Sequence, residues 1–126
     1  MVLKSHKDLI VWQKSIALVK EIYFLTNQFP RTEIYVLTSQ MRRAALSIPS
    51  NIAEGYSRKN LKEYLQFIRV AYGSGAELET QIMIAKDVYK NIDHHTTEAL
   101  LEEILKMLNV IISKLENNQQ QVSSRP

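Results

Sequence analysis

The sequence contains no cysteine and only three glycines and three prolines in 126 residues. Without cysteine the chain cannot form a disulfide framework or a thiolate metal site, and we expect it in the reducing cytoplasm. So few glycines and prolines favour long helices over a sheet with many turns. No apolar run approaches the ~20 residues that a membrane-spanning helix needs, so we expect no membrane association.

The short motifs that mark most catalytic and cofactor sites are also missing. There is no glycine-rich phosphate loop, no H-E-x-x-H and no G-x-S-x-G. Di-metal sites in helix bundles need Glu-x-x-His on facing helices, and none of His6, His94 and His95 has a glutamate at that spacing. The adjacent His94 and His95 are expected to be solvated or to cap a helix. We therefore expect no enzymatic activity, no catalytic residue, no metal and no cofactor.

Apolar residues recur at spacings of three and four along most of the chain, which is typical of helices with one buried face. Four helices joined by short connections should pack as an all-α, antiparallel up-down-up-down four-helix bundle. At this length the chain is expected to be one domain, residues 1–126. The helices are predicted at about 8–28, 32–54, 60–91 and 96–117, and residues 118–126 are expected to fray.

The most specific stretch is Gln40–Gly55, with the sequence QMRRAALSIPSNIAEG, in the second predicted helix. Pro49 predicts a kink there, because proline removes one helical hydrogen bond and its ring clashes with the preceding turn. Gly55 suits the left-handed residue that often ends a helix. Residues spaced by threes and fours form a nearly unbroken heptad seam along this helix, made of Ile34, Leu37, Met41, Ala45, Ile48, Ile52 and Gly55.

The other helices carry their own signals for ends and faces. Asp8, Asn60 and either Asp93 or Thr96 can accept hydrogen bonds from first-turn amides and so cap the helices that follow. Two glycines in a helix interior, Gly73 and Gly75, cost about 0.8–1 kcal/mol each, which predicts close approach of a neighbouring helix or subunit. The first helix is expected to bury Leu9, Trp12, Ile16, Val19 and Tyr23, with Ile22 and Leu25 widening that face.

The net charge of +3 is distributed unevenly. Residues 31–60 carry five basic and two acidic side chains, whereas residues 93–126 carry three basic and five acidic ones. The basic excess around the second helix indicates a surface for a polyanion. The residues expected to form this nucleic-acid-binding surface are Arg42, Arg43, Arg58, Lys59, Lys62 and Arg69.

A polar stripe on the second helix allows a different interpretation. Arg42 or Arg43 can pair with Glu77 or Glu79 of the third helix, at a helix–helix or subunit contact, and bidentate pairing would fix the register. In that case the arginines are structural and the protein is a scaffold for protein–protein interaction. The expected polar network comprises Gln40, Arg43, Asn51, Glu54, Glu77 and Glu79.

Three runs of sequence carry a family resemblance, namely DLIVWQKSIALVKEIYFLTNQFP, QMRRAALSIPSNIAEG and AYGSGAELETQI. They resemble the family encoded within intervening sequences of bacterial 23S ribosomal RNA genes. The resemblance covers about residues 8–92, and the fourth helix matches in pattern only. Val36 departs from it, because members often have glycine at that point.

This family is similar to the accessory variability protein of diversity-generating retroelements, a homopentameric barrel with a basic surface that associates with RNA and reverse transcriptase. The resemblance therefore implies a homo-oligomer, with a pentamer as the model, and a partner that is RNA or a nucleic-acid-processing protein. Our first hypothesis is a non-enzymatic oligomeric bundle that binds structured RNA through phosphate contacts. The scaffold is the alternative.

Overall fold

The computed structural model describes residues 5–124, with side chains described as far as residue 119. The described chain is helical and contains no strand, so the all-α prediction is confirmed. Its long helices are α1 (Ile10–Thr26), α2 (Leu37–Tyr56), α3 (Leu61–Val88) and α4 (His95–Ser124). Short 3-10 turns, η1 (His6–Asp8) and η2 (Arg31–Glu33), precede α1 and α2.

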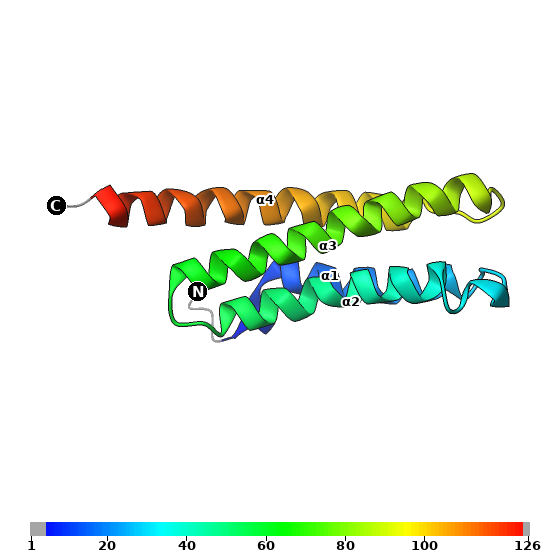
Figure 1. Cartoon of the computed structure of the whole chain (residues 1–126), viewed down its shortest axis with the longest axis horizontal. Coiled ribbons are helices and arrows are strands. Elements are labelled where there is room, and N and C mark those ends of the chain that lie inside the picture. Colours follow the sequence, from blue (N-terminus) through cyan, green and yellow to red (C-terminus); the bar gives the residue numbers. More distant parts are fainter. Residues whose placement is uncertain (1–4, 125–126) are drawn as a thin grey trace.

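The four helices lie side by side around one core (Figure 1). Contacts join α1 to α2, α2 to α3, α3 to α4 and α4 to α1. Figure 1 shows the α1–α2 and α3–α4 turns at one end of the molecule and the α2–α3 turn at the other end. The C-terminal part of α4 reaches beyond the α2–α3 turn. None of the helices described here is both long and apolar enough to cross a membrane.

One face of α2 is buried in the core. Met41, Ala45, Ile48 and Ile52 have no exposed surface, so most of the predicted seam is confirmed. Ile34 was expected to extend that seam, but it is 51% exposed. The reason is that α2 begins only at Leu37, so the preceding η2 turn places Ile34 outside the helical register.

Gly55 does not end α2 as predicted. The chain has no glycine with a positive φ among the described residues, and Gly55 is a helical residue buried against α3. A Cβ atom at Gly55 would lie 2.8 Å from the Phe67 Cβ and 3.3 Å from the Tyr64 backbone oxygen. Close packing of α2 on α3, rather than a turn, therefore explains this glycine. Pro49 is buried inside α2.

The buried face of α1 is rotated from the predicted one. Trp12, Ile16 and Val19 are only half-buried and Tyr23 is 38% exposed, although Ile22 and Leu25 are buried as expected. Because α1 carries apolar residues around most of its circumference, spacing alone does not select a face. The residues that α1 buries are Val11, Ser15, Leu18, Ile22, Leu25 and Thr26.

The predicted caps are partly correct. The Asn60 side chain accepts a hydrogen bond from the Glu63 amide at 2.9 Å, and Asp93 Oδ1 accepts one from the His95 amide at 2.9 Å. Asp8 does not cap α1; instead it completes a capping box with Ser5 around η1. The helix start is therefore displaced to Ile10.

α4 is longer than predicted. It continues to Ser124, where fraying was expected from residue 118 onward, while residues 125–126 lie outside the described part of the chain. Gly75 explains how α4 approaches α3, because a Cβ there would lie 2.6 Å from Leu105 Cδ2. Gly73 is different, since an added Cβ would meet nothing within 4 Å.

Candidate nucleic-acid interface

The six cations expected to bind nucleic acid lie in two places on the chain. Arg42 and Arg43 are in the first half of α2. Arg58 and Lys59 lie in the α2–α3 turn, and Lys62 and Arg69 follow in the first third of α3. Arg43 precedes Tyr56, the end of α2, by 13 residues, or about 20 Å at 1.5 Å per residue. One chain therefore does not gather all six into a single patch.

Arg42 is held by the C-terminal end of α1. Its Nε donates to Thr26 Oγ1 and its Nη2 to Asn27 Oδ1, both at 2.9 Å. The guanidinium also lies over the Tyr23 ring, 4.4 Å from its centroid. A cation at the end of α1 is favourable because the last carbonyls of a helix carry partial negative charge. Arg42 thus joins α1 to α2, and this contact was not foreseen from the sequence.

Arg43, the next residue, is exposed. Among the residues that the structure describes, it forms no hydrogen bond or ion pair. It lies with Arg42 along an open groove of about 400 Å³ on the outer side of α2. The apolar residues of this groove are Ile34 and Leu46, and its polar ones include Thr38 and Ser39.

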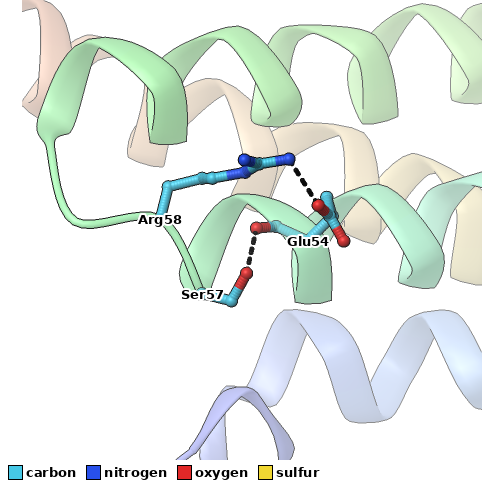
Figure 2. A network of polar contacts seen from close by, with 3 residues as sticks. All are labelled: Glu54, Ser57 and Arg58. Atoms are coloured by element: carbon cyan, nitrogen blue, oxygen red, sulfur yellow. Dashed lines mark hydrogen bonds and ion pairs between the residues drawn. The ribbon is translucent and has the colours of Figure 1, made fainter.

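The α2–α3 turn is braced by the last residues of α2. Figure 2 shows the Arg58 guanidinium reaching back to the Glu54 carboxylate, while the Ser57 hydroxyl donates to the Glu54 backbone oxygen at 2.7 Å. Arg58 also lies over the Phe67 ring, 4.9 Å from its centroid. Glu54 was expected in a network with α3 carboxylates, but its partner is the turn arginine instead.

Lys59 and Lys62 lie at the same end of the bundle as Arg58. Both are exposed, and neither forms a hydrogen bond or ion pair with any residue of the described chain. Lys62 lines a groove of about 570 Å³ between α3 and the C-terminal part of α4, together with Arg69 and Gln119. Arg69 makes an exposed ion pair with Glu116 of α4 at 3.4 Å.

Exposed ion pairs of this kind contribute little to stability, typically below about 1 kcal/mol. Arg58 and Arg69 can therefore exchange their carboxylate partners for phosphate at small cost. Together with Lys59 and Lys62 they form what we call the turn cluster, a set of four cations around the α2–α3 turn and the adjoining groove. The role of these residues in binding stays a prediction.

The expected polar network does not form within one chain. No ion pair joins Arg42 or Arg43 to Glu77 or Glu79 in the described structure. The Glu77 carboxylate accepts only a weak hydrogen bond from Gln81, at 3.3 Å, and Gln40 is exposed. The polar contact between α2 and α3 is a smaller one, in which Ser47 Oγ and Ser74 Oγ lie 2.7 Å apart and Asn51 donates to Ser47.

The opposite end of the molecule is closed by a different set of polar groups. Tyr89, which follows α3, donates a hydrogen bond to the Glu33 carboxylate in η2. This hydrogen bond, with a smaller effect of burial, raises the pKa of the Tyr89 hydroxyl above 10.0. The contact joins η2 to the end of α3, and no motif in the sequence predicts it.

His94 and His95 behave differently from one another. His95 is exposed, as expected, whereas His94 is only 4% exposed and its Nε2 has no hydrogen-bond partner in the described structure. Of the two expectations, solvation is therefore wrong for His94. This residue directly precedes α4, and its backbone oxygen accepts a hydrogen bond from the Glu98 amide at 2.9 Å. Within residues 5–119, no three metal-ligating side chains lie close enough together to hold an ion.

Comparison with known proteins agrees with this architecture. A solved structure described as a protein of unknown function from the S23 ribosomal protein family of Bacteroides thetaiotaomicron is similar, with a TM-score of 0.72. It is 23% identical, and the match covers 82% of this chain and 98% of that one, so it supports the fold alone. No curated protein matches the chain.

The family model of the 23S rRNA-intervening sequence protein matches residues 7–112. This span includes α1, α2 and α3 in full and the first part of α4. It also contains the turn cluster and both α2 arginines. Because the match covers most of the sequence, the chain belongs to the 23S rRNA-intervening sequence protein family.

Proposed function

We propose that this protein is a non-enzymatic, homo-oligomeric bundle that binds structured RNA through phosphate contacts made by the turn cluster. The observation that carries the proposal is the pair Lys59 and Lys62, two exposed cations that have no partner among the described residues. Lys62 lines a groove that Arg69 also lines. Ammonium groups free of carboxylates are available to replace the counterions of a phosphate backbone.

Affinity of this kind needs more than one chain. A net charge of +3 gives a weak field, but each added copy repeats the turn cluster and adds its charge. The family membership also supports an oligomer, since the resemblance described above implies an assembly with a basic surface. We therefore propose that several turn clusters act together, on an oligomer for which the pentamer is the model.

The shape proposed for each subunit is the antiparallel up-down-up-down bundle with a bend of α2 at Pro49. The positions of the three turns support the topology. A proline inside α2 supports the bend, since it leaves one carbonyl of the preceding turn without its usual donor. The proposed cellular location is the cytoplasm.

The test measures binding of a fluorescein-labelled RNA hairpin at a series of salt concentrations. The logarithm of the affinity should fall with the logarithm of salt concentration, with a slope of about −0.7 to −0.9 for each phosphate contacted. Replacing Lys59 and Lys62 by alanine should weaken binding and reduce the slope by about 1 per lysine. The matched control replaces Lys20 and Lys90, which are exposed cations outside the turn cluster.

Two results would count against the proposal. One is an affinity that does not change with salt concentration. The other is equal loss of binding in the control and in the turn-cluster variant. Either result would favour the alternative, a scaffold for protein–protein interaction. One observation already supports that alternative, because Arg42 forms structural hydrogen bonds with the end of α1.

A further inference from the structure

Two grooves of opposite charge are built on different helices of the bundle. The first, which we call the α2 groove, is lined by Ile34, Thr38, Ser39, Arg42, Arg43 and Leu46. The second, which we call the α3–α4 groove, has a volume of about 290 Å³ and is lined by Glu79, Ile82, Met83, Glu98, Leu101 and Glu102. One groove thus has two guanidinium groups and the other has three carboxylates.

Each groove also exposes apolar side chains. In the α2 groove Ile34 is 51% exposed and Leu46 is 44% exposed, and Tyr35 beside it is the most exposed large hydrophobic residue described. In the α3–α4 groove Met83 is 62% exposed. Exposed apolar surface combined with tyrosine, methionine and arginine is the composition that protein–protein interfaces favour.

The charge that remains unpaired is complementary. Glu98 and Glu102 have lysine partners, Lys86 and Lys106, on their own chain. Within the described residues Glu79 has no hydrogen bond or ion pair, and neither has Arg43. Each groove therefore keeps one charge without a partner, and the two charges have opposite sign.

The positions of the grooves suit a contact between copies. The grooves share no helix, because the α2 groove is lined by Ile34 and residues of α2, and the α3–α4 groove is lined by residues of α3 and α4. Both lie toward the end that holds the α1–α2 and α3–α4 turns, because one is built on the start of α2 and the other on the end of α3 and the start of α4. A second copy set beside the first therefore brings them together with little shift along the bundle axis.

We infer that the α2 groove of one copy binds the α3–α4 groove of the next, with Arg43 pairing with Glu79 of the neighbouring copy. This inference rests on the homo-oligomer proposed above and names its contact surfaces. The contact is heterologous, because it joins two different faces, and each copy keeps one groove free for a further copy. Such contacts close into a ring when the rotation between copies divides the circle, whereas an axial shift at each step would give a filament.

Charge reversal tests the pairing directly. Arg43→Glu and Glu79→Arg each place like charges opposite one another, which should weaken assembly roughly tenfold to a hundredfold and shift the mass measured by light scattering toward the 14.6 kDa single chain. The double variant Arg43→Glu/Glu79→Arg restores opposite charges and should recover the mass of the unmodified protein. Lys20→Glu is the matched control, since it makes the same charge change on α1 outside both grooves and should not alter the mass.

The outcomes separate this inference from the proposed oligomer. If the unmodified protein has a single-chain mass at micromolar concentration, the oligomer and the inference both fail. If the protein is an oligomer but both single variants keep its mass, only the inferred contact fails. Loss of assembly in both single variants without recovery in the double variant also overturns the pairing, because a general loss of folding would produce that pattern. Recovery supports it.

Discussion

Two glycine positions allow the closeness of α2 and α3 to be measured as a free energy. Replacing glycine by alanine inside a helix stabilises it by about 0.8–1 kcal/mol through backbone conformation alone. At Gly73 an added Cβ meets no atom within 4 Å, so Gly73→Ala should raise the free energy of unfolding by about that amount. Gly73→Ala is thus the control for the same change at a packed position.

At Gly55 the added Cβ would lie 2.8 Å from the Phe67 Cβ and 3.3 Å from the Tyr64 backbone oxygen. Neither atom is the tip of a flexible side chain, so α2 and α3 must move apart. Overpacking of this kind costs about 1–3 kcal/mol. Gly55→Ala should therefore be less stable than Gly73→Ala by at least about 1–3 kcal/mol. Gly55 lies one residue before the end of α2, so alanine gains no more from helix propensity there than at Gly73.

The assay is urea unfolding followed by circular dichroism, at one protein concentration because assembly adds to apparent stability. The midpoint should rise for Gly73→Ala and fall for Gly55→Ala. Gly75→Ala should lie between them, since its clash is with the mobile Leu105 Cδ2 atom. Equal stability of the Gly55 and Gly73 variants would refute the close packing of α2 on α3.

Three further predictions concern single contacts. Arg42→Ala should lower the free energy of unfolding by about 1–3 kcal/mol, since it removes two hydrogen bonds and a cation–π contact. Lys20→Ala, which removes an exposed cation of α1 outside both grooves, should change it by less than about 0.5 kcal/mol in the same urea assay. The pKa of the Tyr89 hydroxyl is raised in the folded state, so its contribution to stability is fully present below about pH 10 and is lost as the pH rises further. The melting temperature of Tyr89→Phe should therefore fall less steeply above about pH 10 than that of the unmodified protein. Asn60→Ala should cost about 1 kcal/mol, because the Glu63 amide loses its acceptor, and an unchanged urea midpoint would contradict that role.

Much of the fold followed from the spacing of apolar residues. The α2 seam was predictable because the rest of that helix is mostly polar, so only one face satisfies the helical period. The buried face of α1 could not be predicted, because apolar residues surround that helix. Its packing against α2 and α4 determines which side is buried. Ile34 was assigned wrongly for a local reason, since the η2 turn interrupts the register before α2 begins.

The role of Gly55 could not be predicted from the sequence alone. A glycine near the end of a helix has two common causes, a left-handed turn and a close neighbour, and spacing does not distinguish them. At Gly55 the neighbour is Phe67 of α3, which lies 12 residues further along the chain. The cause at Gly55 therefore became apparent only when the approach of α3 was known.

The different contacts of Arg42 and Arg43 could not be predicted from the sequence. Adjacent residues on a helix are about 100° apart, so one arginine reaches α1 while the other faces solvent. Nothing in the sequence distinguishes the two residues, because the difference is made by Thr26 and Asn27 of a separate segment. A variant that replaces both arginines would change stability and surface charge together. Loss of RNA binding or of assembly in it would then have two causes, so the function has to be tested at Arg43, Lys59 and Lys62 with Arg42 left in place.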